Sequence, residues 1–207
     1  MQAVQRRLRS RISSSGRGAV FTPKDFLDIG ARDAVDQALR RLVHRGFIRR
    51  VGRGLYHYPR TNAQLGIDMP PRIDDLAQAI GRQTGSRVTP SGSVAANRLG
   101  LSKQVPAKPT YLSDGRSRDV RVGKTTIRLK HASPKRLLPV RPVSAEVFLA
   151  LDYLGKDGIT ESVIQSIRKH LTPSQCQQLV RDARYAADWI ADAARRIRGN
   201  AEGLLNG

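Results

Sequence analysis

The stretch "RRLVHRGFIRRVGRGLYHYPR", Arg40–Arg60, sets a dense run of arginines around two short apolar segments. "FIRRV" and "LYHYP" alternate apolar and polar residues on either side of "GRG", and this pattern predicts a β-hairpin with a glycine turn. A hairpin needs no positive charge in order to fold. The charge therefore indicates an external partner, and the residues before the hairpin indicate which kind.

Three helices and a short strand are predicted upstream of the hairpin. Apolar residues at every fourth position predict the first helix: Val4, Leu8 and Ile12. After the short apolar run "AVF", Thr22 as N-cap and Pro23 at the first position predict a second, short helix that ends at Gly30. Its apolar face is expected to comprise Phe26, Leu27 and Ile29. A third helix is predicted from about residue 31 to Gly46, with a buried stripe of Val35, Ala38, Leu39 and Leu42.

Helix, short strand, helix, helix and hairpin is the order of a winged helix-turn-helix, in which the third helix enters the DNA major groove and the hairpin, or wing, rides on the backbone. Arginine matches guanine edges and glutamine matches adenine edges, so the candidates for base readout are Arg32, Gln37, Arg40 and Arg41. His44 projects from the same side of the helix. The candidates for phosphate contacts in the wing are Arg49, Arg50 and Arg53. We expect Asp33 and Asp36 to cap the helix or to hold an arginine, and Tyr56 and Tyr58 to face the core.

A protein-interaction role is the alternative, because some winged helices bind proteins and many charge runs are merely solvated. The basic character of both the third helix and the wing favours DNA. The chain has 207 residues and a net charge of +20. Residues 1–60 hold 14 Lys and Arg against 4 Asp and Glu, residues 61–142 hold 15 against 5, and the remainder balances at 8 and 8. Such an excess indicates a polyanionic partner.

The rest of the chain completes an α+β fold, predicted as an N-terminal winged helix-turn-helix (1–60) plus a C-terminal α/β mixed domain ending in a helical bundle. Residues 61–71, rich in Pro, Gly and polar residues, are expected to be a linker. Residues 72–142 are expected to form a basic α+β domain, with a helix from residue 73, another at about 92–99, and a hairpin around Gly123-Lys124. A possible second basic surface comprises Arg116, Arg118, Arg121, Lys124, Arg128 and Lys130.

Residues 143–207 are expected to form a helical region packed on this domain. Ser144 and Thr172 are predicted N-caps, and helices are expected at about 160–170, 173–183 and 185–198. The predicted helical core includes Leu179, Val180, Trp189 and Ile190.

Four strings in order, "RRVGRGLYHYP", "TPSGSVAANRLGLSKQVP", "YLSDGRSR" and "IRLKHASP", resemble the AbiEi-type antitoxins of type IV toxin–antitoxin systems, and in particular the DUF6088 branch. The resemblance covers most of residues 1–140. It implies an N-terminal winged helix that represses its own operon, a C-terminal domain that carries antitoxicity, and a neighbouring gene for an AbiEii-like nucleotidyltransferase toxin.

The polar residues of these strings have two interpretations: they form a surface for RNA, nucleotide or toxin, or they serve the chemistry of turns. They are Ser91, Gly92, Asn97, Tyr111, Asp114, Arg116, Ser117 and His131.

Catalysis is not expected. The sequence has no phosphate-binding loop of the GxxxxGK[ST] type and no GxSxG motif, and its four histidines lack metal-ligand spacing with one another or with Cys176. We therefore expect no cofactor and no metal. Without an apolar run of about 18–20 residues or a secretory signal, the sequence predicts a cytoplasmic protein with no membrane partner.

The hypothesis from sequence is thus a transcriptional autorepressor and antitoxin of an abortive-infection (phage defence) system. Its partners would be double-stranded DNA of its own promoter and a nucleotidyltransferase-like toxin or the RNA substrate of that toxin. The alternatives are an antitoxin that acts mainly by protein or RNA contact, and a stand-alone transcriptional regulator without a toxin. The oligomeric state stays open.

Overall fold

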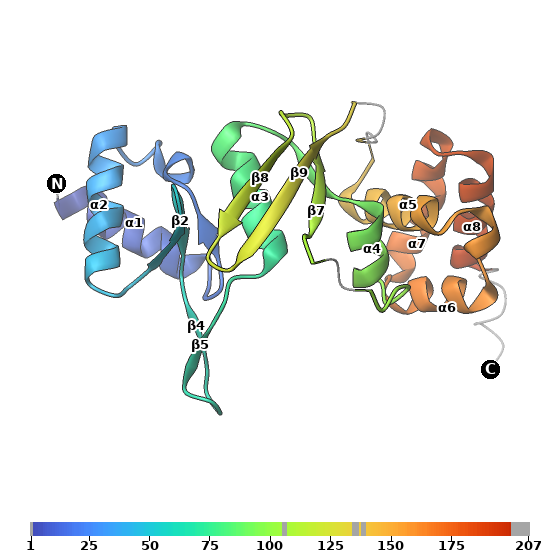
Figure 1. The fold of residues 1–207 in the computed structure, drawn as a ribbon, viewed down its shortest axis with the longest axis horizontal. Coiled ribbons are helices and arrows are strands. Elements are labelled where there is room, and N and C mark those ends of the chain that lie inside the picture. Colours follow the sequence, from blue (N-terminus) through green and yellow to red (C-terminus); the bar gives the residue numbers. More distant parts are fainter. Residues whose placement is uncertain (1, 105–106, 134–136, 138–139, 200–207) are drawn as a thin grey trace. The chain divides into compact units, whose positions relative to one another are not determined.

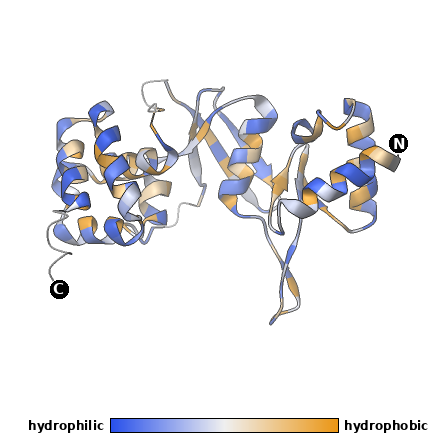
Figure 2. Ribbon diagram, turned by 180° about the vertical axis from the view of Figure 1, so that it is seen from behind, coloured by the Kyte–Doolittle hydropathy of each residue, from blue (hydrophilic) through white to orange (hydrophobic). Residues whose placement is uncertain are grey.

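The computed structural model describes residues 2–104, 107–133, 137 and 140–199, and these residues form a mixed α+β protein with eight α-helices and three small sheets. The chain divides into two compact units (Figure 1). The first unit comprises residues 1–88 and 118–127, and the second comprises residues 89–117 and 128–207. In both units the helices carry hydrophobic and hydrophilic residues together (Figure 2), as amphipathic stripes require.

The helices of the first unit pack around one apolar core. α1 (Gln2–Ser14) buries Leu8 and Ile12, and α2 (Arg32–His44) buries the whole predicted stripe of Val35, Ala38, Leu39 and Leu42. The predicted first and third helices are therefore confirmed. Gly46, with a φ of 69°, ends the α2 segment in the left-handed conformation that glycine adopts at least cost.

The predicted second helix is wrong in kind. Pro23–Phe26 form a single 3₁₀ turn, η1, whose first residues are held by the Asp25 carboxylate, which accepts a hydrogen bond from the Thr22 amide at 2.8 Å. Phe26 and Ile29 are buried as expected, whereas Leu27 is 46% exposed.

A three-stranded antiparallel sheet lies beside these helices, in the order β1 (Val20–Phe21), β3 (Leu55–His57), β2 (Arg49–Gly52). β2 and β3 form the predicted hairpin, with His57 opposite both Val20 and Arg49. Its turn depends on Gly54, whose φ of 68° disfavours any other residue.

Every residue of β3 is buried, so this strand is covered on both faces. Tyr56 and Tyr58 join the helical core, as expected from the sequence. Leu55 and His57 point the other way, because successive side chains of a strand alternate. That second face is covered by α3 (Ile73–Thr84), which contacts β1, β3 and η1.

Between β3 and α3 the chain forms a second hairpin, β4 (Arg60–Asn62) and β5 (Ile67–Met69). This hairpin occupies the segment whose composition suggested a linker. The first unit is completed by β8 (Arg118–Val122), which lies beside β2.

The second unit joins short strands to a helical bundle. β7 (Thr110–Ser113) runs parallel to β9 (Thr125–His131), and within this unit the strands follow the order β6 (Val88–Pro90), β7, β9. The predicted hairpin around Gly123-Lys124 is confirmed as β8 and β9. The helices are α4 (Gly92–Arg98), α5 (Pro142–Leu154), α6 (Glu161–Lys169), α7 (Pro173–Asp182) and α8 (Asp188–Arg198), with 3₁₀ turns at Lys156–Gly158 and Ala183–Tyr185.

The helix caps of the bundle follow the sequence in one case and depart from it in another. Thr172 caps α7 as predicted, and its side chain accepts a hydrogen bond from the Gln175 amide. Ser144 is not an N-cap, because Pro142 at the first helical position begins α5 two residues earlier and leaves Ser144 buried in its first turn. Leu179 and Ile190 lie in the core, with Val180 and Trp189 packed against it.

Polar residues from three strings of the resemblance form hydrogen bonds that hold turns and loops. The Gly115 amide donates to the Ser113 hydroxyl at 3.1 Å, and the His131 amide donates to the Ser117 hydroxyl at 2.8 Å. The Asn97 side chain donates to the carbonyls of Ser102 and Gln104, which fastens the loop after α4. These contacts favour the turn interpretation for Asn97, Ser117 and His131.

Gly92 gives the sharpest test of the packing of the second unit. A Cβ at this position would lie 2.6 Å from the Leu149 carbonyl oxygen and 2.7 Å from the Tyr153 Cβ, so α4 and α5 approach each other closely only with glycine there. Glycine to alanine in an open helix is stabilising by about 1 kcal/mol. Gly92→Ala is expected to destabilise the protein instead. It should lower the free energy of unfolding by about 1–3 kcal/mol, measured by urea denaturation.

Ser93→Ala, one residue further along α4, is the matched control and should leave the free energy of unfolding nearly unchanged. A stabilised Gly92→Ala protein would contradict the packing of α4 on α5 described above.

Candidate nucleic-acid interface

An open groove of about 640 Å³ in the first unit brings together residues from α2, the β2–β3 hairpin and α3. Of the eight DNA-binding candidates, five line it: Arg32, Arg40, His44, Arg50 and Arg53. The other three, Gln37, Arg41 and Arg49, are exposed but are not among its lining residues. A concave surface lined by arginines concentrates positive potential, which favours a polyanion.

The arginines of the groove differ in how they are held. Arg32 donates through Nε to Asp36 at 2.9 Å, so Asp36 holds an arginine as expected from the sequence. Arg50 donates to the Gly52 carbonyl at 3.3 Å within the hairpin. Arg40 and Arg53 have no side-chain hydrogen bond or ion pair among the described residues, and their guanidinium groups remain available to a ligand.

Arg49 has a structural partner that its position in the sequence does not suggest. It forms an ion pair with Asp68 of β5, whose other carboxylate oxygen accepts from Thr61 at 2.7 Å. This arrangement ties the second hairpin to β2. The carboxylate neutralises part of the charge that the sequence assigned to phosphate contact.

Gln83 of α3 is a member of the groove that the sequence gives no sign of. Its side-chain Nε2 donates to the Arg53 carbonyl at 3.0 Å, at the tip of the β2–β3 turn. The turn is thus fixed from outside the hairpin, by a residue 30 positions away along the chain. No spacing or motif could have revealed this contact, because the pairing of distant segments produces it.

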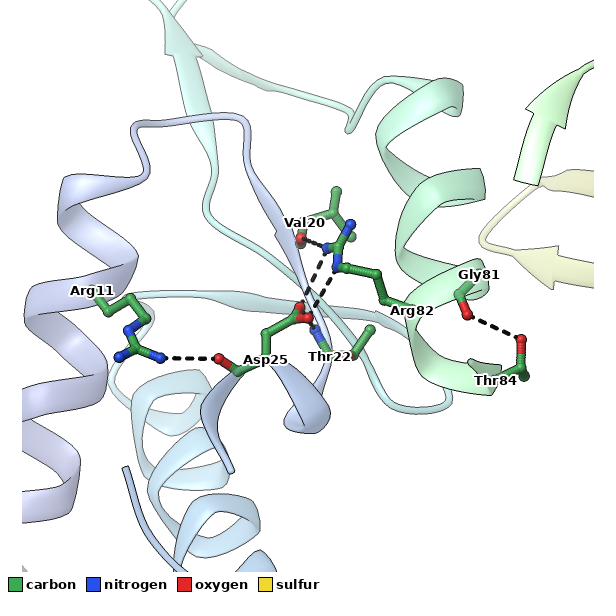
Figure 3. A network of polar contacts seen from close by, with 7 residues as sticks. All are labelled: Arg11, Val20, Thr22, Asp25, Gly81, Arg82 and Thr84. Atoms are coloured by element: carbon green, nitrogen blue, oxygen red, sulfur yellow. Dashed lines mark hydrogen bonds and ion pairs between the residues drawn. The ribbon is translucent and has the colours of Figure 1, made fainter. Parts of the chain in front are cut away.

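A polar network holds α3 in the position from which Gln83 reaches the turn (Figure 3). Arg82 donates through Nε to Asp25 at 2.9 Å and through a terminal nitrogen to the Val20 carbonyl at 2.9 Å. The backbone carbonyl of Asp25 also accepts from Arg11 of α1 at 3.2 Å. Asp25 therefore joins α1, η1 and α3, and Arg82 adds β1 to this network.

The six residues of the predicted second basic surface are all exposed, and they divide between the two units. Arg118, Arg121 and Lys124 belong to the first unit, where β8 lies beside β2. The others, Arg116, Arg128 and Lys130, belong to the second. Arg128 and Lys130 share a face of β9, alternating with buried Ile127 and Leu129 as predicted.

The described part of the chain contains no group of three or more His, Cys, Asp or Glu residues that could hold a metal ion. Burial raises the pKa of the Cys176 thiol, which makes the nucleophilic thiolate scarce. Among the described helices, none combines the length and the apolar character that crossing a bilayer requires.

The comparisons with known proteins gave one match. The sequence profile of a family of unknown function, DUF6088, matches residues 7–179. Neither the curated proteins nor the solved structures yielded a match.

His57 follows the groove residue Tyr56 in β3, and its lowered pKa predicts that the stability of the first unit depends on pH. Burial is the main cause that lowers its pKa, and the Arg49 guanidinium lowers it further, whereas Asp68 and Asp75 act in the opposite direction. The unfolded imidazole, with its ordinary pKa near 6.5, then binds protons more readily than the folded one. Stability is therefore expected to be complete above the unfolded pKa and to decrease as the pH falls from there toward the lowered pKa.

Urea midpoints at neutral pH and at about pH 5.5 measure this dependence. His57→Gln should reduce the difference between the two midpoints, and His170→Gln, at an exposed histidine, should preserve it. If both variants keep the wild-type difference, His57 is not the titrating group.

Proposed function

The chain belongs to the DUF6088 family, and we propose that it is a sequence-specific DNA-binding protein that represses its own operon and serves as the antitoxin of a type IV toxin–antitoxin pair. The observation that carries the DNA-binding part is the groove between α2 and the β2–β3 hairpin. Five arginine and histidine candidates that the sequence singled out line this one concave surface.

The order of elements in the first unit supports a winged helix-turn-helix. α1, β1, η1, α2 and the β2–β3 hairpin follow one another as in that motif, with the 3₁₀ turn η1 in place of the second helix. In this assignment α2 is the recognition helix and the hairpin is the wing. Gln37, Arg40 and Arg41 on the exposed side of α2 are the residues for base edges, and Arg50 and Arg53 are the residues for phosphates.

The groove then has a specific role. When the major groove of a DNA duplex holds α2, one strand passes between the helix and the wing, so its phosphates would meet Arg50 and Arg53. Because the wing turn is fixed by Gln83, little wing flexibility has to be lost on binding.

The antitoxin part of the proposal rests on the four strings of the resemblance. Its partner would be a nucleotidyltransferase-like toxin or the RNA substrate of that toxin. The helical part of the chain, where basic and acidic residues balance, has the charge character of a protein-contacting region more than of a polyanion-binding one.

Fluorescence anisotropy on the duplex upstream of the protein's own gene tests the first part. At about 150 mM salt, where non-specific binding is weak, the upstream duplex should bind at least about 100-fold more tightly than a scrambled duplex. Equal affinity for both duplexes would refute sequence-specific repression, and binding by protein or RNA contact would replace it.

Co-expression with the neighbouring gene tests the second part. If that gene is toxic, the wild-type chain should restore growth. The chain with both Arg50→Ala and Arg53→Ala should restore it as well, provided antitoxicity does not need DNA. Point variants are preferable to removing residues 1–60, because α3 and β8 pack against that segment. A harmless neighbouring gene would indicate a stand-alone regulator.

Arg53→Ala should weaken binding to all duplexes to a similar extent and reduce the slope of log affinity against log salt by about 1, since one phosphate contact is lost. Arg181→Ala removes the same charge from an exposed position on α7 and is the matched control. If the two variants have the same slope, Arg53 does not contact phosphate.

Gln83→Ala should lower DNA affinity about 2–10-fold through the loss of one hydrogen bond to the wing, with an unchanged salt slope because no charge is removed. Gln78→Ala is the control, since Gln78 lies on the same helix and donates to the Val88 carbonyl instead. Equal affinities of the two variants would mean that the Gln83 contact does not position the wing.

A further inference from the structure

A second cavity of about 410 Å³ lies in the first unit, on the other side of β3 from the groove. Tyr56 lines the groove and His57 lines this cavity, and consecutive residues of a strand face opposite ways. Its charged and titratable lining residues are Arg17, His57, Arg60, Arg72, Asp75 and Arg82. We call it the His57 cavity. Its volume is in the range of small-molecule sites.

His57 lines this cavity and has one buried polar atom without a hydrogen-bond partner. The residue is 2% exposed, and its Nε2 atom has no hydrogen-bond partner among the described residues. A buried polar atom without a partner is costly, and native structures keep few of them. Burial lowers the pKa of this imidazole and so favours its neutral form in the folded protein.

The arginines of the cavity are of two kinds. Arg17 and Arg82 are engaged in the fold: Arg17 donates to the Pro59 carbonyl at 3.0 Å and lies over the Tyr58 ring, and Arg82 bonds Asp25. Arg60 and Arg72 have no hydrogen-bond or ion-pair partner among the described residues. The two guanidinium groups are thus charged and exposed at the rim of a cavity whose inner wall holds an unpartnered imidazole.

The position of Arg72 adds to the positive potential. It is the N-cap of α3, a helix of 12 residues, so the amides of the first helical turn favour an anion at this end. Asp75 in that turn is the only carboxylate among the residues that line the cavity. Two free arginine forks and a helix N-terminus suit a doubly charged oxyanion better than a single carboxylate.

We propose that the His57 cavity is a binding site for the phosphate group of a small phosphorylated molecule. Arg60 and Arg72 pair with the phosphate oxygens, and the His57 side chain lies in the wall beside the bound molecule. The site is separate from the groove, because it opens on the opposite face of β3. This proposal goes beyond the DNA-binding function and does not rest on it.

NMR titration of the full chain tests the proposal, with the His57 ring resonances as the readout. The probes are ribose 5-phosphate and AMP, each compared with its unphosphorylated counterpart, ribose or adenosine. The phosphorylated probes should shift the His57 resonances saturably, and the unphosphorylated ones should not. No saturable shift with either phosphorylated probe at millimolar concentration would overturn the proposal.

Charge-removing variants distinguish binding at the His57 cavity from a general effect of the protein's positive charge. Arg60→Gln and Arg72→Gln should each weaken binding of the phosphorylated probe about tenfold, because each removes a charge-assisted hydrogen bond. Both residues are exposed, so the variants are expected to fold. Arg181→Gln should bind the probe like wild type. Equal weakening by all three variants would overturn the proposal, as would a duplex DNA that alone shifts His57.

Discussion

The Arg82 guanidinium is the contact on which the arrangement of the first unit depends. It joins α3 to Asp25 of η1 and to the backbone of β1, and Asp25 in turn closes the turn at Thr22 and receives Arg11 through its carbonyl. An ion pair of this exposure contributes little to stability by itself. Its importance is geometric, because it fixes the helix that covers the second face of β3.

Both surfaces proposed to bind ligands share that helix. Gln83 near its C-terminal end holds the turn of the β2–β3 hairpin, whereas Arg72, Asp75 and Arg82 line the His57 cavity. The spacing of these three residues, at i, i+3 and i+10, places them along one side of α3. β3 separates the two surfaces, with Tyr56 on one face and His57 on the other.

The first unit carries many positive charges, and only some of its arginines are paired with carboxylates. Ion pairs engage four arginines with four carboxylates: Arg11 with Asp28, Arg32 with Asp36, Arg49 with Asp68, and Arg82 with Asp25. The guanidinium of Arg11 accordingly holds the pKa of the Asp28 carboxyl below its usual value. Arg40, Arg50 and Arg53 have no carboxylate partner among the described residues, so part of the uncompensated charge lies at the groove.

Local patterns in the sequence predicted most helices and strands. They could not predict the contacts between segments that are distant along the chain. The stripe of α2 and the hairpin around "GRG" follow from periodicity and glycine positions, and both are confirmed. The four residues between Thr22 and Leu27 carry the sequence signature of a helix start. In the fold they form only a 3₁₀ turn. The segment 59–72 read as a linker from composition, whereas the pairing of Thr61 with Asp68 makes it a hairpin. The contact of Gln83 with the β2–β3 turn and the cavity lined by His57 each involve several distant segments, so no single segment of the sequence predicts them.

The return of residues 118–127 to the first unit has a consequence for biosynthesis. A nascent chain that has exposed only residues 1–88 lacks β8, the strand that lies beside β2. Residues 89–117, which belong to the other unit, must be synthesised first. Bringing the two ends of this intervening segment together has an entropic cost. The N-terminal segment is therefore complete as a folded body only when most of the β8–β9 hairpin has been translated, and a stalled or truncated product would lack the packing of β8 against β2.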